Sequence, residues 1–177
     1  MDYKAFHKHK LHIDNRGYSL IELVIVLAII AVLMGTVFYS IILVFSANAK
    51  SCANNIQRSI GDCKVTTMGK ADAYMELFRE SDGTVYTQMH VTESDGTDEE
   101  RQKVGTNKVY VGYEADGDTK TSLEAGDKIV IRFDRSSGGF RPDAGGVIYK
   151  NIYVEGGSKK YRIEMIPFTG KSQVIVE

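Results

Sequence analysis

The chain is poor in the residues that build disulfide scaffolds, proline-broken loops and histidine-based sites. Of its 177 residues only two are cysteine, two are proline and four are histidine, and tryptophan is absent. Two cysteines are too few for a disulfide scaffold. The two prolines, Pro142 and Pro167, leave helices and strands largely uninterrupted. Outside the first 17 residues the only histidine is His90.

The chain also lacks a strong net charge. Its formal charge of −1 excludes a general attraction to nucleic acid or anionic lipid. The charge is unevenly placed, because the basic residues of segment 1–17 outnumber its acidic ones and the remainder is net acidic. A length of 177 residues is enough for one modest domain with a hydrophobic core.

No charged residue interrupts segment 23–45, LVIVLAIIAVLMGTVFYSIILVF. This run exceeds the roughly 20 residues that cross a bilayer core of about 30 Å. The basic cluster precedes it and the first charge after it is Lys50, so the positive-inside bias predicts a cytoplasmic N-terminus and an exported remainder. Two simple alternatives are a signal peptide cut at Ala47-Asn48-Ala49, although the run is longer than the roughly 7–15 residues of a signal core, and an uncleaved anchor.

Neither alternative explains Glu22, which stands immediately before the apolar run. An ionisable residue at the start of a spanning helix costs about 2–3 kcal/mol on insertion scales, and less near the interface. The sequence offers no cation within one helical turn after Glu22. Such residues usually have a partner, and another chain could supply one.

The stretch Arg16-Gly17-Tyr18-Ser19-Leu20-Ile21-Glu22-Leu23, between a basic leader and a long apolar run, resembles the N-terminus of type IV prepilins and pseudopilins. The resemblance implies cleavage after Gly17 by a prepilin peptidase, N-methylation of the new N-terminal residue Tyr18, and Glu22 as the assembly carboxylate. Tyrosine replaces the phenylalanine that is usual at this position. The implied partners are the peptidase, other pilin or pseudopilin subunits, an inner-membrane assembly platform with its ATPase, and membrane lipid before assembly.

Elementary electrostatics fits that role for Glu22. Cleavage after Gly17 frees an α-amino group that is largely cationic at neutral pH. In a packed filament Glu22 of one subunit can pair with the amino group of Tyr18 of its neighbour. Because each charge is costly alone in a low dielectric and attracts its partner strongly, such a pair sets the axial register of the apolar helices.

An apolar stripe follows the membrane segment. Cys52, Ile56, Ile60 and Cys63 recur at helical spacing, which predicts one helix from about Tyr18 to residues 66–69, about 75 Å long. On that helix the cysteines lie about 16 Å apart along the axis, beyond the roughly 7 Å that a disulfide allows. Buried thiols are the prediction; an intermolecular bridge or a metal site stays open, although no C-x-x-C spacing supports a metal.

From Ala73 onward the sequence reads as short strands separated by turn signals. The alternation in 129–133 and 161–166 is typical of half-buried strands, and Ser81-Asp82-Gly83 predicts a hairpin. The predicted strands are 74–79, 85–91, 109–113, 129–133, 147–154, 161–166 and 174–176. This order predicts an antiparallel sheet or small sandwich, and with the helix an α+β class.

The C-terminal half carries a second, narrower resemblance. Phe133-Asp134-Arg135-Ser136-Ser137-Gly138, followed later by a hairpin with a Thr169-Gly170-Lys171 turn, resembles the GspH/FimT family of minor pseudopilins and minor pilins. The resemblance implies a minor subunit rather than the bulk one. Residues 66–128 match nothing recognisable.

Other groups of charged residues and histidines point less clearly to a functional site. The acidic residues Glu93, Asp95, Asp98, Glu99 and Glu100, and the triplet Asp116-Gly117-Asp118, lack the spacing of a calcium loop, so solvated loops are expected. Members of the FimT-like group can contact DNA, and Lys159, Lys160, Arg162 and Lys171 are the candidate phosphate contacts, although an ordinary charged sheet face is the simpler interpretation. No nucleophile or metal motif indicates an enzyme or a cofactor, and the leader histidines His7, His9 and His12 lie in a segment expected to be removed.

The sequence therefore predicts a prepilin with four parts. These are a cleaved leader (1–17), a transmembrane and assembly half-helix (18–46), an amphipathic half-helix (47–70) and a β-rich domain (71–177). The expected function is that of a structural, minor subunit of a type IV pilus-like filament or type II secretion pseudopilus, first anchored in the cell membrane and then displayed outside. The alternatives are a DNA-binding subunit for DNA uptake and a signal-anchored surface protein that never assembles.

Overall fold

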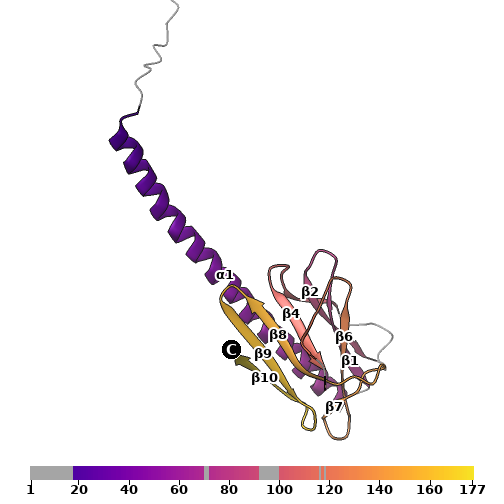
Figure 1. Cartoon of the computed structure of the whole chain (residues 1–177). Coiled ribbons are helices and arrows are strands. Elements are labelled where there is room, and N and C mark those ends of the chain that lie inside the picture. Colours follow the sequence, from indigo (N-terminus) through magenta and orange to yellow (C-terminus); the bar gives the residue numbers. More distant parts are fainter. Residues whose placement is uncertain (1–17, 70–71, 92–99, 116, 118) are drawn as a thin grey trace, which may run out of the picture. The chain divides into compact units, whose positions relative to one another are not determined.

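The computed structural model describes residues 18–69, 72–91, 100–115, 117 and 119–177 (Figure 1). The chain divides into two compact units, Met1–Phe38 and Tyr39–Glu177. Helix α1, Leu20–Gly69, contributes its first part to the former and its second part to the latter. The β-strands belong entirely to the second unit.

Helix α1 has 50 residues and contains no proline, so nothing in its sequence removes a backbone hydrogen bond. Its last residue is Gly69, in keeping with the preference for glycine near helix ends. In the second unit the predicted stripe is buried, with Cys52, Ile56 and Cys63 fully inaccessible and Ile60 1% exposed. These residues place one side of this half of the helix in the core.

Ten strands follow in the described part of the second unit. They are β1 (Ala73–Arg79), β2 (Val85–Val91), β3 (Gln102–Gly105), β4 (Tyr110–Ala115), β5 (Thr121–Ser122), β6 (Lys128–Phe133), β7 (Phe140–Arg141), β8 (Tyr149–Gly156), β9 (Lys159–Ile166) and β10 (Lys171–Val176). Sheet A has the order β3-β2-β1-β6-β7 and sheet B the order β10-β9-β8-β4-β5. Every strand pair in the described part of the chain is antiparallel, which confirms the predicted α+β class.

The two sheets and α1 share one hydrophobic core. On β1 the side chains of Met75 and Leu77 are buried, and on β9 those of Ile163 and Met165 are, while their neighbours along each strand are more exposed. This period of two is the signature of strands with one face on a core. The helical stripe completes that core, and Figure 1 shows sheet B in front of the second half of α1.

The strand ends differ from the sequence prediction mainly where strands are short or polar. β3, β5 and β7 are strands of four, two and two residues that the sequence analysis did not predict. β10 begins three residues earlier than expected, at Lys171. The hairpin of β1 and β2 is confirmed, with Gly83 at a φ of 82° in its turn. Cys52 and Cys63 are free and buried, as predicted.

Candidate functional site

The first turn of α1 is closed by a reciprocal pair of hydrogen bonds. The backbone N–H of Ser19 donates to Oε2 of Glu22 at 2.8 Å, and the backbone N–H of Glu22 donates to Oγ of Ser19 at 3.3 Å. This is a capping box, in which Ser at the N-cap and Glu three residues later satisfy each other's backbone donors. The S-x-x-E pattern that signals it is present in the sequence, and the sequence analysis missed it. Glu22 therefore has a partner within its own chain.

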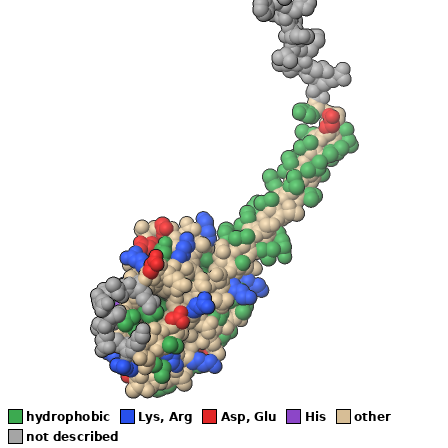
Figure 2. Space-filling view, turned by 180° about the vertical axis from the view of Figure 1, so that it is seen from behind, with side chains coloured by type: hydrophobic (Ala, Val, Ile, Leu, Met, Phe, Trp, Pro, Cys, Tyr) green, Lys and Arg blue, Asp and Glu red, His purple; other side chains and the backbone are tan. Residues whose placement is uncertain are grey.

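The rest of the first unit's helix is apolar on all sides. Leu20 is 82% exposed, and the large hydrophobic side chains from Ile21 to Met34 are 40–68% exposed. Figure 2 shows hydrophobic side chains over the visible face of this segment. A helix that is apolar all round belongs in a bilayer or a protein core. Helix α1 is long and apolar enough to cross a membrane.

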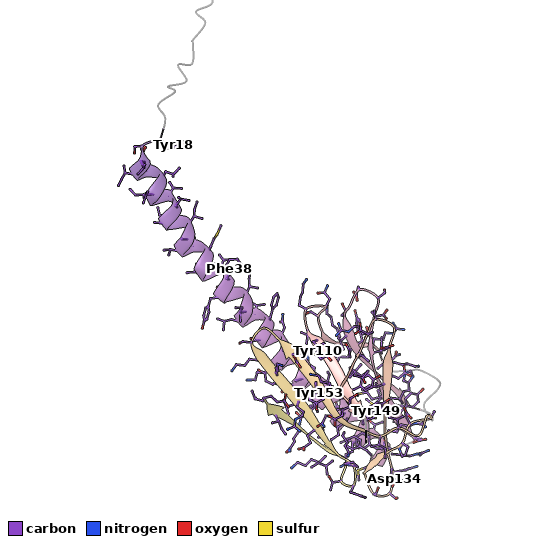
Figure 3. All side chains as sticks on the ribbon, viewed as in Figure 1. Tyr18, Phe38, Tyr110, Asp134, Tyr149 and Tyr153 are labelled. Atoms are coloured by element: carbon purple, nitrogen blue, oxygen red, sulfur yellow. The ribbon has the colours of Figure 1, made fainter. Side chains whose placement is uncertain are left out.

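The predicted processing site falls partly outside the described residues. Gly17 and the leader 1–17 lie outside them, whereas Tyr18 is described, lies one residue before Ser19 and is 87% exposed (Figure 3). The residue that would become the new N-terminus thus precedes a capped helix directly. Glu22 lies in the first turn of that same helix.

The two segments that carry the C-terminal resemblance meet in space. A Cβ at Gly170 would overlap the carbonyl oxygen of Gly138, so these backbones pass each other at a distance that only glycine permits. The N–H of Phe140 donates to the carbonyl of Pro167 at 2.7 Å, joining β7 to the β9–β10 turn. Lys64 of α1 donates to the carbonyl of Thr169 at 2.6 Å. Helix, sheet A and sheet B are therefore tied together here.

The four basic residues proposed as DNA contacts do not lie together. Lys171 pairs with Ile166 at one end of β9, whereas Lys159 and Lys160 lie at the other end. Nζ of Lys160 lies 3.5 Å from an oxygen of Glu155. Lys159 and Lys160 are therefore separated from Lys171 by the length of β9, and Lys160 has the carboxylate of Glu155 beside it.

The same sheet face carries several acidic groups that neutralise its cations. Glu155 accepts a hydrogen bond from Lys120, which lowers the pKa of its carboxyl group. Nε of Arg162 lies 3.0 Å from an oxygen of Glu177. Such pairing weakens an interaction with phosphate over the middle of this face. The face therefore resembles a self-complementary charged surface more than a continuous basic patch.

A hydrogen-bonded cluster occupies the middle of this face. Oη of Tyr153 donates to Oε2 of Glu114 at 2.6 Å, and Nδ2 of Asn151 donates to the same oxygen at 3.0 Å. These bonds lower the pKa of Glu114, and the bond to Glu114 together with burial raises the pKa of Tyr153 to about 12. Glu114 is therefore held ionised and Tyr153 neutral, which are the charge states in which the tyrosine donates to the carboxylate.

The described residues hold no cluster of metal-ligating side chains. Among them, no group of three or more His, Cys, Asp or Glu side chains is arranged to hold a metal ion. Of the acidic loop only Glu100 is described, and of the Asp116–Asp118 triplet only Gly117; the others lie outside the described residues. A cavity of about 420 Å³ on sheet A is lined in part by Glu76, Lys128 and Arg101, and the first two form a 2.9 Å ion pair.

These features define an α+β protein with an apolar N-terminal helix fit to anchor it in a membrane, capped by a serine and a glutamate. Residues 14–38 match the family model of the prokaryotic N-terminal methylation motif. The chain is therefore type IV prepilin-like, and the resemblance read from the sequence is confirmed at this level. Searches among curated proteins and among solved structures returned no match. The narrower GspH/FimT resemblance stays a prediction.

Proposed function

We propose that this protein is a structural, minor subunit of a type IV pilus-like filament or of a type II secretion-type pseudopilus. Prepilin peptidase cuts after Gly17, and the new N-terminal Tyr18 is N-methylated. The observation that carries the proposal is the first turn of α1. There Glu22 is held next to the expected cut site, at the start of an apolar helix, within the segment that matches the methylation motif.

The arrangement of the second unit supports the minor-subunit assignment within the GspH/FimT group. The segment ending at Gly138 and the turn containing Gly170, which carry that resemblance, pack against each other in the fold. That contact is a physical reason for a glycine at position 170, and the φ of 68° at Gly138 is a separate reason for a glycine there. The proposal includes no catalytic role, no metal and no cofactor.

Assembly then exchanges one partner of Glu22 for another. In the free subunit the carboxylate accepts the hydrogen bond of Ser19 N–H. In the filament it pairs with the cationic amino group of Tyr18 of a neighbouring subunit. The neighbour's charge makes the interaction stronger, because in a dry environment a full positive charge attracts the carboxylate more strongly than the dipole of a neutral N–H group does. Register along the filament follows from the fixed place of Glu22 in its helix.

Each of the four predicted segments of the chain has its own place relative to the membrane in this proposal. The leader 1–17 faces the cytoplasm and is removed, and residues 18–46 cross the membrane and later line the filament core. Residues 47–70 and 71–177 form the exported domain. The partners are prepilin peptidase, other pilin or pseudopilin subunits and the inner-membrane assembly platform with its ATPase.

The first experiment determines the N-terminus and intact mass of the protein purified from native membranes or sheared filaments. A chain that begins at Tyr18 and is heavier by one methyl group supports the proposal. A chain that begins at Lys50 would identify ordinary secretion, and one that begins at Met1 an uncleaved anchor. Either result would overturn the proposal.

A pair of substitutions separates the assembly role of Glu22 from its capping role. Glu22→Gln keeps a capping-box residue but removes the charge, whereas Ser19→Ala keeps the charge and removes the cap. We expect Glu22→Gln to abolish recovery of the subunit in sheared filaments while cleavage after Gly17 continues. Ser19→Ala should retain recovery. Equal recovery of both variants would contradict an assembly role for the charge.

A further inference from the structure

The turn between β8 and β9 lies directly against α1. A Cβ at Gly157 would lie 2.5 Å from the carbonyl oxygen of Ile42, and the N–H of Ser158 donates to Oγ of Ser46 at 3.3 Å. Gly157 has a φ of 60°, in the left-handed region that glycine tolerates. Figure 1 shows this end of the β8–β9 hairpin beside the helix. The β8–β9 turn is thus held against α1 at the level of residues 42–46 along the helix axis.

That level coincides with the end of the uncharged run. Residues 23–45 extend over about 34 Å as a helix, slightly more than the roughly 30 Å of a bilayer core. When this run crosses a membrane, Ser46 and the turn bonded to it lie at the level of the lipid headgroups. This step rests on the membrane-anchored form in the proposed function.

Three lysines gather at the same level. Lys50 follows Ser46 by one helical turn, and Lys159 and Lys160 are the first two residues of β9, directly after Ser158; all three lysines are exposed. Of these, the side chain of Lys160 is 61% exposed although it lies 3.5 Å from Glu155. Glu155 already accepts a hydrogen bond from Lys120, so it neutralises only part of the cluster.

An aromatic side chain accompanies these cations. Tyr110 pairs with Glu155 across β4 and β8, which places it at the same end of sheet B, and it is 36% exposed. Nζ of Lys120 lies 5.0 Å from the centre of its ring. Tyrosine and basic residues together are the composition of a membrane–water interface.

We propose that Lys50, Lys159 and Lys160 form a basic collar that binds the headgroups of anionic phospholipids in the outward-facing leaflet before assembly. Headgroup phosphates meet the three ammonium groups at the level where the β8–β9 turn contacts α1. Assembly withdraws the collar from the lipid surface as the helix leaves the membrane. Lipid charge thereby sets how strongly the unassembled subunit is retained.

The test measures which lipid lies next to the turn. The full chain with Ser158→Cys is labelled with a fluorophore, because the native cysteines are buried, and is reconstituted in phosphatidylcholine nanodiscs. Traces of nitroxide-labelled phosphatidylglycerol or phosphatidylcholine then quench the label. With about fivefold enrichment expected for each lysine near an anionic lipid, we expect phosphatidylglycerol to quench several-fold more strongly. About 0.5 M NaCl should remove the difference.

Matched variants decide the outcome. At about fivefold for each lysine removed, Lys159→Gln with Lys160→Gln should reduce the enrichment of phosphatidylglycerol by up to about 25-fold. Lys171→Gln, at the other end of β9, should leave it unchanged. Equal quenching by both lipids, or equal effects of the two variants, overturns the proposal. So does a loss of duplex DNA binding in the double variant with unchanged lipid enrichment.

The failure of this proposal is distinguishable from failure of the proposed function. The N-terminal residue and mass of the native protein report processing at Gly17 independently of lipid. A native chain beginning at Tyr18 without lipid enrichment refutes only the collar. A native chain beginning at Met1 with lipid enrichment keeps the collar and refutes the filament role.

Discussion

Removing the side chain of Ile56 tests whether the second part of α1 is a core element of the β-rich domain. Ile56 is completely buried in the core shared by the helix and both sheets. Ile56→Ala deletes three carbon groups, worth about 2.4 kcal/mol of transfer free energy at about 0.8 kcal/mol each. The cavity left behind adds to that value, so a loss of about 3–4 kcal/mol is expected within the usual range of 2–5.

A loss of that size is a large part of the total stability of a domain, which is typically about 5–15 kcal/mol. Val65→Ala on the same helix is the matched control, because Val65 is 72% exposed. Its effect should stay within about 0.5 kcal/mol of zero. The difference between the two variants isolates burial from helix propensity.

The assay is urea unfolding of the full chain in detergent micelles, followed by near-ultraviolet circular dichroism. The chain has ten tyrosines and no tryptophan, so this signal reports the packing of tyrosines. The apolar half of α1 remains helical in the micelle and does not contribute to the transition. A loss below about 1 kcal/mol for Ile56→Ala, or one equal to that of Val65→Ala, would refute the assignment of this half-helix to the core.

Four further predictions concern the domain. Gly170→Ala should lower the free energy of unfolding by at least about 3 kcal/mol, because the new Cβ overlaps Gly138 and the φ of 57° strains any L-residue; wild-type stability would contradict the contact. Gly61→Ala should raise it by up to about 1 kcal/mol, since nothing lies within 4 Å of the new Cβ in mid-helix. Cys52, whose pKa burial raises to about 12, should resist maleimide at pH 8 until urea unfolds the domain. The pKa of Tyr153 is raised to about 12, so its bond to Glu114 stabilises the domain below about pH 10, and this stabilisation is lost as the pH rises toward 12. Urea titrations at each pH should therefore show a smaller loss of stability between pH 10 and 12 for Tyr153→Phe than for the wild type.

The sequence predicted the elements whose periodicity is strong. In segment 129–133 Ile129, Ile131 and Phe133 alternate with Val130 and Arg132, and this segment lies in β6. The stripe from Cys52 to Cys63 corresponds to the buried side of α1. In both cases each local residue choice agrees with the environment that the fold provides. Long, regular elements of this kind carry their own evidence.

The short strands carried no such evidence. β3 reads Gln-Lys-Val-Gly, and only Val104 and Gly105 are buried. Its place is decided by pairing with β2 and by Cys52, whose Sγ would lie 2.8 Å from a Cβ on Gly105. These are contacts between residues far apart in the chain, and no local pattern encodes them. β5 and β7 have two residues each, too few for any periodicity.

For the candidate sites, too, distance along the sequence did not predict distance in the fold. Lys159, Lys160 and Lys171 lie within 13 positions of one another in the sequence, which suggested one patch. The antiparallel turn after β9 sends the chain back and places Lys171 opposite Ile166, so sequence proximity becomes separation along a strand. Conversely, Gly138 and Gly170 are distant in sequence and touch in the fold.

Glu22 shows how one residue serves two environments. Before assembly the side chain needs a partner at a place where an unpaired carboxylate costs about 2–3 kcal/mol, and less near the interface. The N–H of Ser19 supplies that partner, and a cap of this kind contributes roughly 0.5–2 kcal/mol, which offsets much of the penalty. Glutamate is the residue whose length closes a capping box from the third helical position and whose charge attracts a neighbour's amino group. Glutamine meets only the first requirement and alanine meets neither, so the demand for both explains a carboxylate at the edge of an otherwise apolar helix.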